Sequence, residues 1–270
     1  MNLDFHGMQV VITGAAGIVG RRLVQSFAQE GCDLYLIDRE APHDLVVTAQ
    51  RSGGRNVKFQ AIDLTNDEQI AKLCFTIEQE WGAADVLINN AGVYPLNPLL
   101  SMTIQEWDTV MTINLRAPFI LTKEMARLMI QRKRHGSIIN ISSGAALRTK
   151  VGHGHYSTSK AALEMLTKSF ALELAPFNIR VNALAPGFAP GSCGSHLPLD
   201  YVQKMAESIP LGRLSGEFDA SAAALFLVSS QAAFITGATL SVDGGRGAGI
   251  LSSLDRKQLI KRGTSREGEI

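Results

Sequence analysis

Short apolar runs alternate with longer amphipathic segments along most of this chain. Runs typical of buried strands lie at residues 9–13, 33–37, 57–62, 85–89, 137–141, 179–184 and 239–242. Segments with apolar residues at helical spacing separate them, near residues 67–81, 103–133, 155–175 and 217–230. Strands that alternate with helices predict a parallel sheet covered on both faces. We therefore expect an α/β, doubly wound fold with its ligand beyond the carboxyl ends of the strands.

A glycine-rich turn follows the first apolar run. Residues 14–20 read GAAGIVG, and Val19, Leu23 and Phe27 then recur at helical spacing as far as Gly31. Strand, glycine-rich turn and helix in this order are typical of a dinucleotide site, where the backbone approaches a pyrophosphate at a helix N-terminus. The sequence thus predicts a Rossmann-like sheet in a three-layer α/β/α single domain.

Asp38 stands at the end of the second run, about 20 positions after the turn, where an acidic residue binds the ribose 2′-hydroxyl of NAD. The alternative is a solvated carboxylate at a strand end. A phosphate dianion of NADP would be repelled by Asp38, so we expect NAD, with NADP less favoured. Arg39 follows directly and could soften that repulsion.

Tyr156 and Lys160 lie one helical turn apart, and positions i and i+4 share a helix face. A phenol has a pKa of about 10 and needs a nearby cation to exchange protons near neutrality. Ser143 lies upstream and offers a hydroxyl that could hold a substrate oxygen beside the tyrosine. The pair alone is common by chance on surfaces. The rest of the chain strengthens the functional interpretation of this pair, because Ser143 and the glycine-rich turn both follow strand ends.

These motifs resemble the compact, single-domain branch of the short-chain dehydrogenase/reductase family, over about residues 7–245. The resemblance rests on TGAAGIVG at 13–20, NNAG at 89–92, Asn114 in TINL, Ser143, Tyr156 with Lys160, Pro186-Gly187 and VDGG at 242–245. Ser143 precedes Tyr156 by thirteen residues, the family's offset, which favours it over the neighbouring Ser142 as the active hydroxyl.

The resemblance implies a role for each matching residue. Tyr156 would be the general acid/base, Lys160 would lower its pKa and bind the nicotinamide ribose, and Ser143 would polarise the substrate carbonyl. Asn114 would hold a water that passes protons to solvent. The implied cofactor residues are Gly14, Gly17, Ile18, Val19, Gly20, Asp38, Asp63, Leu64, Asn90, Gly92, Tyr156, Lys160, Pro186, Gly187 and Ala189. Among them, Asp63 and Leu64 would meet the adenine.

Two positions depart from the family pattern. Ile18 stands where the compact branch usually has glycine, and the spacing of Gly14, Gly17 and Gly20 resembles the extended branch, which contains sugar-nucleotide epimerases. Gly191 stands where a threonine typically contacts the nicotinamide carboxamide, and Ser192 is the nearest hydroxyl. Gly17 would make the same close approach to the pyrophosphate from one position earlier, so we expect the cofactor site to survive. The carboxamide contact and the shape of the lid are in question.

The substrate pocket is expected between residues 93–96, 144–155 and a lid at 188–199. Tyr94, Ala145, His153 and Phe188 are the candidate pocket residues, and His155 is a weaker one. Because these segments are small or apolar, we expect a neutral secondary alcohol or ketone rather than a phosphorylated or coenzyme A-linked substrate. The leading function is an NAD(P)-dependent alcohol dehydrogenase or carbonyl reductase. An epimerase and a non-catalytic dinucleotide-binding sensor are the alternatives.

Composition narrows the remaining choices. The chain has 270 residues and a formal net charge of +1, with both signs dispersed, which gives no reason to expect nucleic acid. The sequence shows no apolar N-terminal signal segment and no uninterrupted apolar run long enough to span a bilayer, so we expect a cytoplasmic protein without membrane contact. Cys32, Cys74 and Cys193 read as reduced thiols, and no metal-ligand spacing occurs.

The domain expected from the sequence spans residues 1–247 and includes a lid at about 188–210. Residues 248–270 extend past the family's usual end, and a short helix could run from Ser252 through Lys261. This tail is expected either to contact a neighbouring subunit or to be frayed. A homo-oligomer, tetramer or dimer, is the expected assembly.

Overall fold

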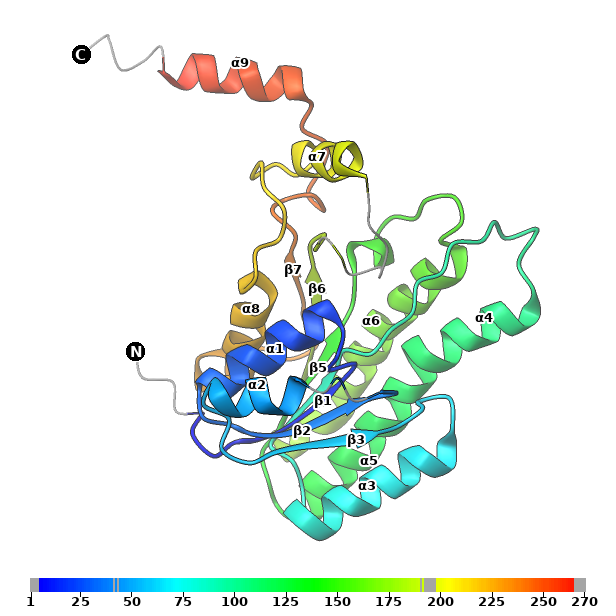
Figure 1. Ribbon diagram of the computed structural model, residues 1–270, viewed down its shortest axis with the longest axis vertical. Helices are drawn as coiled ribbons and strands as arrows, with labels where there is room; N and C mark the ends of the chain where they lie inside the picture. The colour runs from blue at the N-terminus through cyan, green and yellow to red at the C-terminus, as the bar shows by residue number, and fades with distance from the viewer. Residues whose placement is uncertain (1–4, 41, 43, 190, 192–197, 265–270) are drawn as a thin grey trace.

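A seven-stranded parallel sheet forms the centre of the molecule (Figure 1). The computed structural model describes residues 5–40, 42, 44–189, 191 and 198–264. The strands are β1 (Gln9–Thr13), β2 (Asp33–Asp38), β3 (Val57–Ala61), β4 (Val86–Asn89), β5 (Ser137–Ile141), β6 (Arg180–Pro186) and β7 (Thr239–Val242). Their order is β3-β2-β1-β4-β5-β6-β7, and every pairing is parallel. The predicted doubly wound α/β fold is confirmed.

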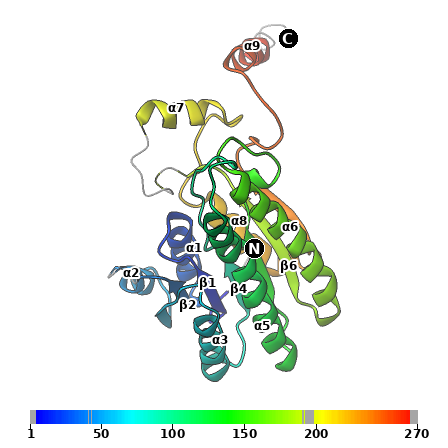
Figure 2. The same ribbon diagram turned by 90° about the vertical axis from the view of Figure 1, so that its right-hand side faces the viewer.

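Helices cover both faces of this sheet. They are α1 (Ile18–Gln29), α2 (Leu45–Arg51), α3 (Asp67–Trp81), α4 (Ile104–Met111), α5 (Ala117–Gln131), α6 (Gly154–Leu174), α7 (Leu199–Glu207), α8 (Asp219–Val228) and α9 (Ser253–Thr264). Successive strand residues point to opposite faces. Val10 and Ile12 therefore pack with α1, α2 and α8, whereas Val11 packs with α3 and α5 on the other side (Figure 2).

The strand order reverses beside β1. The chain leaves β3 at one edge of the sheet and returns as β4 on the other side of β1. In open α/β sheets such a switch point leaves a crevice at the carboxyl ends of the strands, where ligands bind. The glycine-rich turn after β1 and the NNAG segment after β4 both lie at this point.

The predicted helix at residues 103–133 is interrupted. It begins with a capping box between Thr103 and Glu106, and a π-helical segment at Thr112–Arg116 separates α4 from α5. Such bulges are frequent at functional sites, and this one contains Asn114. Helical spacing alone cannot reveal a π-bulge, because apolar positions on either side stay compatible with one helix.

Two helices, α2 and α7, were not predicted from the sequence. The short α2 offers only two buried residues, and α7 buries none. In Figure 1, α7 and α9 lie beyond the carboxyl ends of the strands, away from the three layers. α9 starts where the sequence predicted, with Ser252 and Asp255 bonded to each other, but it continues past Lys261 to Thr264.

Cys32 and Cys74 are buried, unbridged thiols, and burial raises the pKa of each to about 12. Both are therefore unreactive at neutral pH. The predicted thiol Cys193 and the hydroxyl of Ser192 lie outside the described residues. Among the helices that the structure describes, none combines the length and apolar character needed to cross a bilayer.

Candidate active site

The glycine-rich turn is fixed by two of its three glycines. Gly14 has φ +63°, and an added Cβ there would lie 2.7 Å from Ala91 Cα. A Cβ on Gly20 would lie 2.0 Å from the Gly14 carbonyl oxygen, so only glycine lets α1 pack this closely on the turn. Gly17 differs: its φ is −68°, and no described atom comes closer than 3.4 Å to an added Cβ.

Neither backbone conformation nor packing within the described protein therefore requires glycine at position 17. A ligand that approaches the helix N-terminus would require it, because a missing side chain lets a pyrophosphate reach the backbone N–H groups. This observation fits a dinucleotide cofactor.

Asp38 lies at the end of β2 and is bonded to the same turn. Its carboxylate accepts hydrogen bonds from Ala16 N (2.9 Å) and from Arg39 N (2.8 Å). A carboxylate has about four acceptor sites, so these two bonds leave capacity for a ribose hydroxyl. Asp38 thus serves the fold and remains available to a nucleotide.

The remaining adenosine-side candidates are largely engaged with the protein. Asp63 accepts from the backbone N–H and hydroxyl of Thr65, and these bonds lower the pKa of its carboxyl. Leu64 is buried. Asn90 donates its side-chain amide to Thr13 O (3.0 Å) and Gly14 O (2.9 Å). It ties the end of β4 to the turn, a bracing role that the sequence did not reveal.

Tyr156 and Lys160 occupy the first turns of α6, as predicted. Lys160 is 4% exposed, and its ammonium donates to Ile141 O at 2.7 Å. The ammonium lies 5.9 Å from the centre of the Tyr156 ring. Burial lowers the pKa of Lys160 to about 8. A cation in this low-polarity setting acts strongly on a neighbouring phenol and favours its anionic form.

Asn114 connects this pair to the loop after β4. Its side-chain oxygen accepts from Val93 N (2.8 Å), and its amide donates to Val93 O (2.8 Å) and to Ser159 Oγ (3.1 Å). Ser159 in turn donates to Tyr156 O. An added Cβ on Gly92 would lie 3.4 Å from both Asn114 Oδ1 and Lys160 Nζ. The loop, the π-helical segment and α6 therefore meet around Lys160.

The two adjacent serines have different partners. Ser142 is buried and donates to Glu164 Oε1 at 2.6 Å. Ser143 accepts from Ala145 N at 3.2 Å, which leaves its hydroxyl hydrogen for another acceptor. The geometry agrees with the structural interpretation of Ser142, because its proton is already donated to a carboxylate.

Aromatic rings flank Tyr156. The rings of Tyr94 and His153 each lie 5.8 Å from that of Tyr156, edge to face. Phe188 contacts Tyr201 of α7, with ring centres 6.3 Å apart. His155 is 0% exposed and lies near the exposed Glu106; burial lowers its pKa, and its suggested contact with substrate stays a prediction.

After β6 the chain passes close to the VDGG segment. Gly187 donates to Val242 O, and an added Cβ there would lie 3.0 Å from Asp243 Cα. Pro186 ends β6 and Ala189 is buried. These contacts hold the start of the predicted lid against the sheet.

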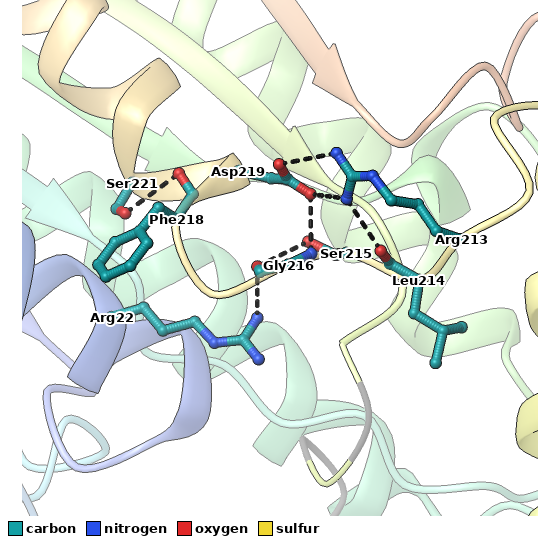
Figure 3. Close-up of polar contacts among 8 residues, drawn as sticks. All are labelled: Arg22, Arg213, Leu214, Ser215, Gly216, Phe218, Asp219 and Ser221. Carbon is teal, nitrogen blue, oxygen red and sulfur yellow. Dashed lines mark hydrogen bonds and ion pairs between the residues drawn. The ribbon is translucent and has the colours of Figure 1, made fainter.

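The segment between α7 and α8 is tied to α1. Arg22 donates to Gly216 O at 3.1 Å, and Arg213 pairs with Asp219 across the same turn (Figure 3). Asp219 also accepts from Gly216 N at 2.7 Å. The helix that carries the glycine-rich turn thus contacts the segment that follows the lid.

Comparison with known proteins agrees with these features. A family model described as Enoyl-(Acyl carrier protein) reductase matches residues 14–246. A 3-oxoacyl-[acyl-carrier-protein] reductase of Thermotoga maritima is 36% identical over 245 residues, which cover 90% of this chain and 99% of the relative. A cyclopentanol dehydrogenase of Comamonas is 37% identical over 242 residues, which cover 87% of this chain and 95% of the relative. The chain belongs to the short-chain dehydrogenase/reductase family.

Solved structures of the family superpose on the chain. A short chain dehydrogenase of Leptospira borgpetersenii with bound NAD+ gives a TM-score of 0.82 at 28% identity, over 90% of this chain and 94% of that one. A gluconate 5-dehydrogenase of Burkholderia cenocepacia in complex with NADP and tartrate gives a TM-score of 0.83 at 30% identity. The match covers 92% of this chain and 98% of that one. The chain is thus an oxidoreductase of this family, whose solved structures include one with NAD+ and one with NADP bound.

The two departures from the family pattern contact each other. Gly191 has φ +84°, and an added Cβ there would lie 2.8 Å from Ile18 Cδ1. A threonine at position 191 would collide with the isoleucine that replaces the family's glycine. Ile18 and Gly191 therefore lie close together in space, and the positive φ of Gly191 by itself disfavours a threonine there.

Proposed function

We propose that the protein is an NAD-dependent oxidoreductase that interconverts a neutral secondary alcohol and its ketone. The observation that carries this proposal is the buried Lys160 ammonium beside Tyr156, with the free hydroxyl proton of Ser143 at the end of the adjacent strand. A dinucleotide-binding sensor has no need of such a group. Bound cofactor would supply or accept the hydride.

The protein's own residues position the substrate and move the proton. Tyr156 donates its hydroxyl proton to the substrate oxygen during reduction and withdraws a proton during oxidation. Lys160 stabilises the phenolate that exists between these steps. Ser143 donates a hydrogen bond to the same oxygen, where negative charge develops. Asn114 holds Val93 and Ser159, and through Ser159 the backbone of Tyr156.

Cofactor preference follows from the charge at the end of β2. Asp38 would lie beside the 2′-phosphate of NADP, and like charges this close cost several kcal/mol. We expect the wild type to favour NAD over NADP by at least about tenfold in kcat/KM. Asp38→Asn keeps an acceptor for Ala16 N but loses the acceptor for Arg39 N together with the charge, and it should narrow the preference for NAD. Arg39→Ala is the matched control on the neighbouring cation. Equal efficiency with both cofactors in the wild type would refute the proposal.

A second candidate function is reduction of a 3-oxoacyl group on a carrier protein. The name of the Thermotoga maritima relative favours it, whereas the description of the family model shares the carrier protein but names reduction of an enoyl group. A panel of neutral ketones, 3-oxoacyl-coenzyme A and carrier-linked 3-oxoacyl substrates, assayed for NADH and NADPH oxidation, separates the two. Exclusive use of the carrier-linked substrates would replace the first candidate by the second. Product formation without net change in the cofactor would instead indicate an epimerase.

A further inference from the structure

We propose that His153 is a specificity-determining residue that binds a second oxygen of the substrate, on a carbon adjacent or next-but-one to the reacting carbon. This inference rests on the proposed function, since it places a second polar contact beside Tyr156. The substrate class it implies is a hydroxyketone or dicarbonyl compound rather than a simple ketone.

The first observation is position. His153 immediately precedes α6, and its ring lies edge to face with that of Tyr156, at 5.8 Å between ring centres. The ring of Tyr94 also lies 5.8 Å from that of Tyr156. A substrate held with its reacting oxygen at Tyr156 would therefore extend past one of these two rings.

The second observation is an unmet hydrogen-bonding group. His153 Nε2 is buried and makes no hydrogen bond within the described residues. Buried polar atoms are nearly always paired, and an unpaired one costs about 1–3 kcal/mol. A substrate oxygen would meet this requirement at the point where it affects recognition.

The third observation is the character of the imidazole. Burial, together with Lys150 and His155, lowers the pKa of His153 and keeps the ring neutral at pH 7. A neutral imidazole nitrogen donates or accepts according to its tautomer. A hydroxyl group satisfies either tautomer, and a carbonyl oxygen satisfies the N–H form. Neither choice demands a charged substrate, which agrees with the neutral pocket.

His155 shows why position matters. Both of its ring nitrogens are also buried without a hydrogen bond to described residues, but the residue is 0% exposed and its charged neighbour is Glu106 of α4. It has no comparable contact with Tyr156 among the ring contacts of the described chain. Of the two histidines, only His153 combines an unmet nitrogen with a place beside the proton donor.

The test uses three cyclohexanones reduced with NADH by wild type, His153→Phe and His153→Gln. The probes are cyclohexanone, 2-hydroxycyclohexanone and 4-hydroxycyclohexanone, the last carrying the same hydroxyl at a distance that His153 should not serve. We expect the wild type to favour the 2-hydroxy compound by about tenfold or more in kcat/KM, because a site built for a hydroxyl discriminates against analogues without it. Phenylalanine keeps the ring contact and should abolish the preference. Glutamine restores an amide nitrogen and should recover part of it.

His135→Ala, an exposed histidine far from Tyr156 in sequence and on another segment, serves as the control and should leave all three rates unchanged. Wild-type turnover of all three compounds at equal efficiency would overturn the inference while leaving the proposed function intact. An unchanged preference in folded His153→Phe would also overturn it. If no ketone in the panel were reduced with either cofactor, the proposed function would fall, and the inference with it.

Discussion

Two regions of the site are built differently. The base comprises the end of β5 and helix α6, where backbone and side chains join Ile141 to Lys160 and Ser142 to Glu164. The cover comprises α7, the segment at residues 208–218 and α9. No residue of α7 is buried, and Leu199 is 87% exposed. The cover is held by side chains such as Arg256 on the carbonyl of Ile209 and Arg246 on Met205, by backbone bonds from Leu211 to Gly244 and from Ser215 to Phe188, and by the buried side chain of Ile209.

This difference matches two tasks. Proton transfer requires donors and acceptors fixed to within a fraction of an ångström, and the buried hydrogen bonds of the base provide that rigidity. Substrate entry requires a segment that can open at low free-energy cost, and regions with few buried contacts open most easily. Changes in the base should therefore affect rate, whereas changes in the cover should affect substrate affinity.

The largest effect is expected in the base from Tyr156→Phe. Removing the hydroxyl should lower turnover by about 10²–10⁴-fold, the contribution of general acid–base catalysis. Fold and NADH binding should persist, since only one oxygen atom is lost. In the wild type, the oxidation rate should rise with pH through one ionisation below the free-phenol value of about 10. Stopped-flow rates, NADH titration and thermal melting measure these outcomes; wild-type turnover in the variant would contradict the assignment.

A pair of glycine substitutions separates the needs of the fold from those of the cofactor. Gly20→Ala places a Cβ 2.0 Å from the Gly14 carbonyl oxygen and should destabilise the protein by about 1–3 kcal/mol or more. Gly17→Ala has room within the described protein, so its unfolding midpoint should stay near wild type while NADH binding weakens. Denaturant unfolding and NADH fluorescence titration check both. Unchanged NADH affinity in Gly17→Ala would contradict the placement of the pyrophosphate.

The smallest effect is expected in the cover from Arg256→Ala. Arg256 donates to the carbonyl oxygens of Glu207 and Ile209, and so joins α9 to the end of α7. Its loss should raise KM for the alcohol or ketone by a few-fold, because a hydrogen bond to a charged group contributes about 1.5–3 kcal/mol and this one stabilises only the local structure. The value of kcat, the NADH affinity and the unfolding midpoint should stay nearly unchanged. Arg256→Lys should recover part of the effect. A variant whose kcat falls while KM stays constant would show that base and cover are not separable in this way.

The amino-acid sequence by itself determined the fold class, the order of most elements and the motif residues. Apolar alternation identified all seven strands to within about two residues, since buried parallel strands need continuous apolar runs. The spacing of Tyr156 and Lys160 placed both on one helix face, a local property of helix geometry.

Only the tertiary structure decided features that depend on distant contacts. The π-helical segment at Asn114 is accompanied by side-chain bonds to Val93, 21 residues away, which no periodic pattern records. The sequence of α7 is amphipathic, yet this helix buries none of its residues within the described chain, and only the fold decides whether an amphipathic stretch packs on the core. Ile18 and Gly191 looked like two separate departures from the family pattern; the folded chain brings them close together in space, which sequence spacing does not record.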